Sequence, residues 1–210
     1  MKDTKIKMEA EKQLAQERRQ NRCQKKLQWE HQLSQILPPL FIKAHLRDLQ
    51  QPLCERILTL RPEQGLFLWG DVGTGKSHAM AAIARYYITK NKSVRRIRYD
   101  SLLLKIRDTY KNKSESELTV VTPLVDADIL ILEDIGTTVG SGTQESDFSI
   151  RTFLLLLDAR LEDCKPTFLT SNKPQAVIER SFDARVASRL AATLGVMKLS
   201  GIDRRRQTRQ

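Results

Sequence analysis

Cysteine is scarce in this sequence, and the residues present are scattered. Cys23, Cys54 and Cys164 are separated by long stretches of chain, and none has a partner at the spacing of a zinc site. No disulfide framework can be read from them, so the sequence excludes a small, disulfide-stapled secreted fold. A reducing cytoplasm is the compartment that we expect.

Long apolar runs are also absent. No stretch approaches the roughly 18 apolar residues of a membrane-spanning helix. The charged start at Met1 and Lys2 is not followed by the apolar core of a signal peptide. We therefore expect a cytoplasmic protein with no membrane partner.

Negative charge is in deficit, because 36 Lys and Arg residues face 25 Asp and Glu residues, a net charge of +11. Such a protein commonly meets a polyanion, either nucleic acid or an anionic membrane surface, although solubility alone is the alternative. Residues 85–113 hold ten basic and two acidic residues, whereas residues 114–172 hold three basic and eleven acidic ones. These segments form either two faces of one globule or complementary surfaces of neighbouring subunits.

Glycine and proline are missing from the first 37 residues, which are rich in Lys, Glu, Gln and Arg. This composition predicts a basic N-terminal helix over residues 1–37, partly disordered at its start, followed by one domain over residues 38–210. Trp29, Leu33 and Ile36 keep helical spacing. They either bind a groove on a partner or pack on the chain's own core.

Short apolar runs alternate with helical patterns in the larger domain. After a helical linker at 40–62, we expect strands at 66–69, 94–99, 129–132, 167–170 and 196–199, and helices at 77–89, 101–110, 147–161 and 183–194. Ser101 is expected to cap the second of these helices. The alternation predicts a three-layer α/β fold with a five-stranded parallel sheet.

A phosphate-binding pattern follows the first of these strands. It comprises Gly70, Asp71, Val72, Gly73, Thr74, Gly75, Lys76 and Ser77. The glycines let the loop fold around phosphates, and the following helix adds its positive end. We expect Lys76 to reach the β- and γ-phosphates of ATP and the Ser77 hydroxyl to bind Mg²⁺.

Paired acids follow the buried strand at 129–132. The carboxyl ends of parallel strands share one edge, so Glu133 and Asp134 are expected beside the phosphate loop. We expect Glu133 to hold the metal and Asp134 to polarise the attacking water. Asn172, at the end of the next strand, is placed to orient that water. Surface acids and a plain polar loop are the alternatives.

Taken together, the phosphate loop, the paired acids and the segments around them resemble those of the bacterial DnaC/DnaI-type helicase loaders of the AAA+ class. The resemblance covers residues 38–206 and rests on five segments: GLFLWGDVGTGKSH at 65–78, ADILILEDIG at 127–136, TFLTSNKP at 167–174, FDARVASRL at 182–190 and VMKLSGIDRR at 196–205. It implies a P-loop AAA+ core with little or no helical lid. The protein would self-associate into a spiral or ring.

Roles for several basic residues come from that resemblance. Arg189, or Arg185 as second choice, would reach the ATP of a neighbouring subunit, and Arg205 would contact ATP within its own subunit. The part of the basic stretch expected to touch single-stranded DNA includes Lys105, Arg107, Lys111 and Lys113. A salt bridge is the alternative for Arg189, and a solvated surface is the alternative for the DNA contacts.

The function expected on this basis is ATP-dependent delivery of a replicative hexameric helicase to single-stranded DNA. An IstB-like helper of transposition is the nearest rival. A small-molecule kinase is a rival of another class, but paired acids and a strand ending in Asn172 fit a water-activating ATPase better.

Overall fold

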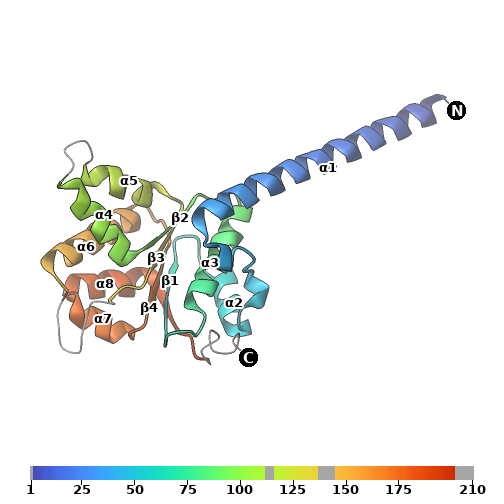
Figure 1. The fold of residues 1–210 in the computed structure, drawn as a ribbon. Coiled ribbons are helices and arrows are strands. Elements are labelled where there is room, and N and C mark those ends of the chain that lie inside the picture. The colour runs from blue at the N-terminus through green and yellow to red at the C-terminus, as the bar shows by residue number, and fades with distance from the viewer. Residues whose placement is uncertain (1, 112–115, 137–144, 202–210) are drawn as a thin grey trace.

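In the computed structural model, residues 2–111, 116–136 and 145–201 are described (Figure 1). Five strands form one all-parallel sheet in the order β2-β3-β4-β1-β5. They are β1 Gly65–Trp69, β2 Val94–Arg98, β3 Ile129–Glu133, β4 Thr167–Ser171 and β5 Leu194–Lys198. The predicted five-stranded parallel sheet is confirmed.

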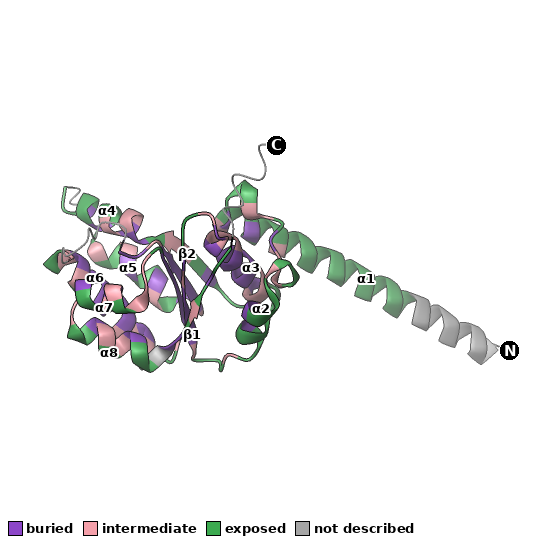
Figure 2. Ribbon diagram, turned by 90° about the horizontal axis from the view of Figure 1, so that it is seen from below, coloured by how far each residue is buried: buried purple, intermediate pink, exposed green. Residues whose placement is uncertain are grey.

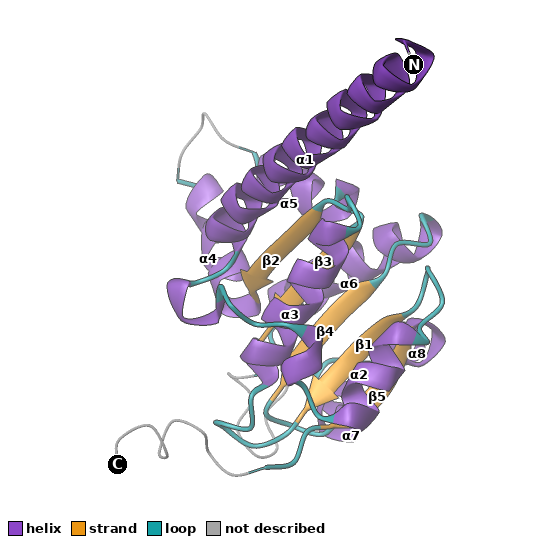
Figure 3. Ribbon diagram, turned by 90° about the vertical axis from the view of Figure 1, so that its right-hand side faces the viewer, coloured by secondary structure: helices purple, strands orange, loops and turns teal. Residues whose placement is uncertain are grey.

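Helices cover both faces of the sheet, which gives three layers (Figures 1 and 3). One face carries α1 Lys2–Ile36, α2 Gln51–Leu58 and α3 Lys76–Thr89, together with the short 3₁₀ helices Pro39–Phe41 and Leu46–Asp48. The other carries α4 Tyr99–Thr109, α5 Glu117–Asp126, α6 Asp147–Glu162, α7 Gln175–Ser181 and α8 Ala184–Thr193. Each face has its own apolar core, because side chains of each strand alternate between the two.

The boundaries of α4 differ from the sequence prediction. The helix begins at Tyr99, with Arg98 as its N-cap residue and no side-chain cap bond. Ser101 therefore lies inside the first turn, and its predicted capping role is wrong. The early start follows from Tyr99, which is buried among the aromatic rings of Phe153 and Phe182.

Two helices, α5 and α7, were not expected from the sequence. An internal proline, Pro123, obscures the helical pattern of α5. Its start is nevertheless capped, since the Ser116 hydroxyl accepts a hydrogen bond of 3.3 Å from the amide of Thr119.

The far end of α5 is fixed by Arg160, which is only 1% exposed. Its guanidinium donates to the carbonyls of Leu124, Ala127 and Pro166 at 2.7–2.8 Å. The orphan carbonyls of a helix end are thus satisfied by one buried cation. Burial lowers the pKa of Arg160 to about 10.

The last turns of α1 pack on the domain, whereas residues 13–28 are exposed along a helix that projects away from it (Figure 2). Leu33 is buried in the same apolar core as α3, and Trp29 and Ile36 pack against that core. Of the two interpretations of these three residues, packing on the chain's own core is the one that the structure shows. They do not form a free patch for a partner.

Candidate ATPase site

The phosphate loop connects β1 to α3 at the carboxyl edge of the sheet. Gly70 has φ +154°, and a Cβ there would lie 2.1 Å from the carbonyl oxygen of Leu199. Gly75 is the N-cap of α3 in the left-handed region, with φ +98°. Only glycine meets both requirements, and the loop therefore ends directly on the positive end of a helix.

Lys76 is the first residue of α3 and is buried. Its Nζ donates to the carbonyl oxygens of Gly70 and Asp71 at 2.7 and 2.8 Å. Thr74 Oγ1 donates to the Asp71 oxygen at 2.8 Å. These bonds hold the Lys76 ammonium group against the loop. An anion bound by the loop amides would contact that group there.

The two acids lie at the end of β3, and each forms an ion pair with an arginine of β2. Glu133 is buried and paired with Arg96. Asp134 Oδ2 lies 3.2 Å from Arg98 Nη2. Asp134 has φ +60°, and its amide donates to the buried Thr170 Oγ1 at 3.0 Å. Neither arginine pairing was predicted from the sequence, although Arg96 and Arg98 lie two residues apart along one strand.

Ser171 joins the three segments of the site. Its carbonyl accepts from the Gly70 amide at 3.3 Å, and its hydroxyl donates to the Ile135 carbonyl at 2.8 Å. The same hydroxyl accepts from the Lys173 amide at 3.0 Å, on the far side of the exposed Asn172. The phosphate loop, the acid turn and the Asn172 segment are therefore brought together, as predicted from the parallel topology. The role of Ser171 was not predicted from the sequence. Two successive hydroxyl residues, Thr170 and Ser171, at the end of a buried strand could have indicated it.

The donors near the loop suit a cation shared with phosphates. Mg²⁺ is commonly held by one or two protein oxygens together with phosphates and water. Ser77, in the first turn of α3, and Glu133 offer one hydroxyl and one carboxylate. No group of three or more His, Cys, Asp or Glu residues able to hold a metal occurs among the residues described.

The two candidate finger arginines both have acidic neighbours in their own chain. Arg189, on α8, forms an ion pair with Asp158 of α6, and both side chains are partly exposed. Arg185 Nη2 lies 2.8 Å from Asp183 Oδ2. The salt-bridge alternative is thus met for Arg189 in this single chain. Arg205 lies outside the described residues.

The predicted DNA-contacting residues Lys105, Arg107 and Lys111 are exposed on or just after α4, and Lys113 lies outside the described residues. Tyr99 is buried and its hydroxyl donates to the main-chain carbonyl of Ser149, so it belongs to the core and not to the exposed surface of α4. Tyr110 is exposed. The Arg107 guanidinium lies 5.1 Å from the ring centre of Phe148.

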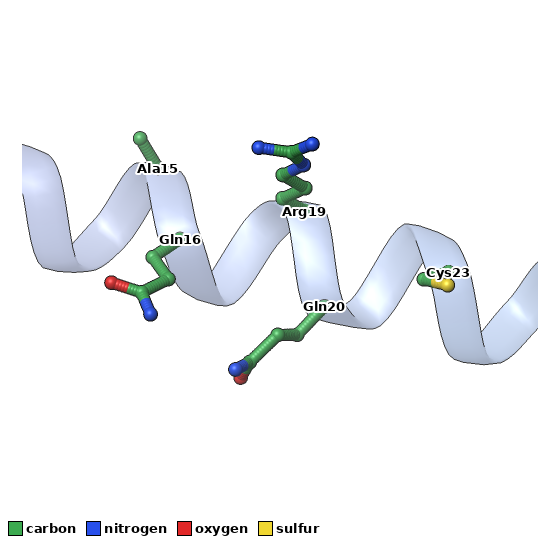
Figure 4. A pocket seen from close by; sticks show the side chains of 5 residues that line it. All are labelled: Ala15, Gln16, Arg19, Gln20 and Cys23. Carbon is green, nitrogen blue, oxygen red and sulfur yellow. The ribbon is translucent and has the colours of Figure 1, made fainter.

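Two observations concern parts of the molecule other than the phosphate loop. An open hollow on α1 is lined by one helix face, namely Ala15, Gln16, Arg19, Gln20 and Cys23 (Figure 4). It lies on the exposed part of that helix and is separate from the phosphate loop. Within the part of the chain that the structure describes, no helix is both long enough and apolar enough to span a membrane.

Fold and site together define a P-loop ATPase of the AAA+ class. The sequence profile of the bacterial DnaA ATPase domain matches residues 59–197, and the chain belongs to that family. It is 27% identical over 121 residues to the replicative helicase loader DnaC of Escherichia coli K12, which covers 58% of this chain and 47% of DnaC. The chain therefore spans about half the length of this curated relative.

Two solved structures have a fold similar to that of this chain. A crystal structure of DnaI has a TM-score of 0.65 and 22% identity, and it matches 82% of this chain and 98% of that one. A putative primosome component from Streptococcus pyogenes serotype M3 is 27% identical, with a TM-score of 0.59 over 80% of this chain and 92% of that one. The resemblance to DnaC/DnaI-type proteins expected from the sequence is confirmed.

Proposed function

We propose that this chain is a replication helicase loader that uses ATP to control its hold on a ring helicase. The observation that carries the proposal is the junction at Ser171, where the phosphate loop, the acid turn and the Asn172 segment meet through hydrogen bonds of 2.8–3.3 Å. The similarity to DnaC supports a role in replication.

In the proposed cycle, residues Gly70 to Ser77 hold the phosphates of ATP, and Lys76 neutralises the β- and γ-phosphates. Ser77 and Glu133 would bind Mg²⁺, which supplies charge neutralisation at those phosphates. Asp134 accepts the proton of the attacking water while Asn172 orients it. The water oxygen forms a bond to the γ-phosphorus, the bond between that phosphorus and the bridging oxygen breaks, and ADP leaves with the electron pair of the broken bond.

The proposed assembly is a spiral or ring of subunits on single-stranded DNA. Arg189 serves the ATP of the neighbouring subunit, and Arg205 serves its own. ATP binding at the boundary then orders the spiral, and hydrolysis dissolves it once the helicase has been delivered. Such a cycle controls the affinity for partners and requires no metabolic product.

The exposed part of α1 is the proposed helicase contact. Trp29, Leu33 and Ile36 pack on the domain, so they are not available for a contact through this helix, whereas the side chains of residues 13–28 are exposed. These residues project from the domain (Figure 1). We propose that the protein works in the cytoplasm, where replicative helicases act.

Affinity capture from the source cell tests this function. The full chain is used as bait with a non-hydrolysable ATP analogue and, separately, with ADP. Enrichment of a replicative ring helicase in the analogue sample supports a loader. Enrichment of a transposase instead would favour the IstB-like alternative, and equal recovery in both samples would contradict control by ATP.

A further inference from the structure

Asp134 has a backbone conformation that is uncommon for residues other than glycine. Its φ is +60°, in the left-handed region, which Asp and Asn enter more readily than most side chains. Within the described part of the chain, the other non-glycine residues with positive φ are Asn91 and Cys164. Both follow the ends of helices, α3 and α6, where a left-handed residue is ordinary. Asp134 follows a strand instead, so its conformation needs another support.

The left-handed residue breaks the alternation of side chains at the end of β3. Leu130, Leu132 and Ile135 are all buried in the core beneath α6. Regular alternation would place residue 134 in that core and residue 135 on the opposite face of the sheet. Because Ile135 takes the place in the core, the Asp134 side chain stays out of it and is 23% exposed. The turn thus keeps the second of two consecutive acids away from apolar surroundings.

Thr170 of β4 holds the backbone on both sides of Asp134. The Asp134 amide donates to Thr170 Oγ1 at 3.0 Å, and the Ile135 amide donates to the main-chain carbonyl of Thr170 at 2.9 Å. The two peptide groups that flank the Asp134 Cα are therefore both bonded to one residue, which restricts φ and ψ of Asp134 together. Thr170 is fully buried, so water is no substitute for either bond.

The place of Thr170 in the sheet relates this turn to the phosphate loop. β4 lies between β3, which leads into the acid turn, and β1, which leads into the phosphate loop. Thr170 is the register partner of Leu68, and both Leu68 and Phe168 face the core beneath α3. Because side chains alternate along a strand, the Thr170 hydroxyl lies on that same face. The group that holds Asp134 is therefore on the side of the sheet where the phosphate loop enters its helix.

We propose that Thr170 is a positioning residue for ATP hydrolysis. It holds Asp134 in the left-handed conformation and so sets where the carboxylate meets the attacking water. The proposal rests on the proposed role of Asp134 in accepting a proton from that water. A displacement of about 1 Å at a reacting group can lower a rate by about a hundredfold, so a fixed backbone at this residue matters for turnover. Thr170 itself touches neither nucleotide nor water in this scheme.

Thr170→Val removes the hydroxyl with little change in side-chain volume. The Asp134 amide loses its acceptor, and we expect turnover at saturating ATP to fall at least about tenfold. Binding of a non-hydrolysable ATP analogue should stay within about twofold of the parent, because Lys76 and the phosphate loop are unchanged. Thr170→Ser keeps the hydroxyl and should retain most of the turnover.

Thr167→Val is the matched control. Thr167 is also a buried threonine of β4, and its Oγ1 accepts a hydrogen bond of 2.9 Å from Arg160 Nε, at the other end of the strand. The change removes a buried acceptor in the same way but leaves the acid turn intact, so turnover should equal that of the parent. An equal loss of turnover in Thr167→Val and Thr170→Val would assign the effect to general destabilisation and overturn the proposal.

Hydrogen exchange of the Asp134 amide, followed by NMR, measures the hold of Thr170 without hydrolysis. This amide should exchange at least about tenfold faster in Thr170→Val than in the parent and should stay protected in Thr170→Ser. Unchanged exchange in Thr170→Val, or turnover within about twofold of the parent despite faster exchange, would overturn the proposal. If Thr170→Val does not fold, Thr170→Ala removes the same hydroxyl and is judged by the same outcomes. Undiminished turnover in Asp134→Asn would instead contradict the proposed function, while the exchange measurement still decides whether Thr170 holds the turn.

Discussion

The hydroxyl of Ser171 donates a 2.8 Å hydrogen bond to the main-chain carbonyl of Ile135. This bond ties the end of β4 to the turn that carries Asp134, while the Ser171 carbonyl accepts from the Gly70 amide of the phosphate loop. Ser171 is fully buried, so none of these groups has water as a substitute partner. The relative placement of the phosphate loop and the acid turn depends on this residue.

Changing Ser171 to Ala tests that dependence. The Ile135 carbonyl and the Lys173 amide each lose a partner, so we expect a loss of about 1–3 kcal/mol in the free energy of unfolding. Urea denaturation measures it. Ser34→Ala is the matched control, because the Ser34 hydroxyl also donates to a carbonyl, that of His31 at 2.7 Å, but is exposed. Equal losses of unfolding free energy in the two variants would contradict the claim that Ser171 holds the phosphate loop and the acid turn together.

The two acids should respond differently to removal of their charge. Asp134→Asn should bind ATP with the parent's dependence on Mg²⁺ and lose turnover. Glu133→Gln should weaken the Mg²⁺ dependence of nucleotide binding and also lower stability, because Arg96 would be left buried without an anion. Nucleotide titration at several Mg²⁺ concentrations and a hydrolysis assay separate the two. Identical behaviour would contradict the division of labour.

Much of this architecture could be predicted from local patterns. The apolar runs before Gly70 and before Glu133 are short, continuous and followed by polar groups, which is typical of buried parallel strands. Parallel topology then places the ends of these strands at one edge. That is why the phosphate loop, the paired acids and Asn172 could be grouped without coordinates.

The features that could not be predicted from the sequence depend on contacts between residues far apart along the chain. The end of α5 is satisfied by Arg160, 33–36 residues further along, and no local pattern marks that pairing. The pairing of Arg96 with Glu133 likewise depends on which strand lies beside β3. The own-core packing of Leu33 depends on how α1 meets α3, which helical spacing alone leaves open.

The basic surface of α4 should bind nucleic-acid phosphate. Changing Lys105, Arg107 and Lys111 together to Ala should weaken binding of single-stranded DNA, and the slope of log affinity against log salt should fall by about 0.7 for each lost contact. The matched control changes Arg18, Lys25 and Lys26, which are exposed on α1. A lower slope in the control alone would move the DNA site to the N-terminal helix.

Arg189 should act on the ATP of a neighbouring subunit. Arg189→Ala and Lys76→Ala should each be nearly inactive alone and should recover activity when mixed, because some boundaries then pair an intact loop with an intact finger. Asp158→Asn is the control, since it removes the Arg189 ion pair and keeps the arginine. If it were as inactive as Arg189→Ala, the ion pair would be what matters. Co-assembly without recovered activity would make Arg189 a residue of its own subunit, and Arg185 would be tested next.

The most direct test of the account is the affinity of Lys76→Ala for ATP. Lys76 lies against the phosphate loop, where its charge-assisted hydrogen bonds to phosphate should each be worth about 1.5–3 kcal/mol. Equilibrium titration with a fluorescent ATP analogue should therefore show at least about tenfold weaker binding than the parent. Lys90→Ala, at the other end of α3, should bind as the parent does. Binding of Lys76→Ala within about twofold of the parent would contradict the assignment of Gly70 to Ser77 as the nucleotide site.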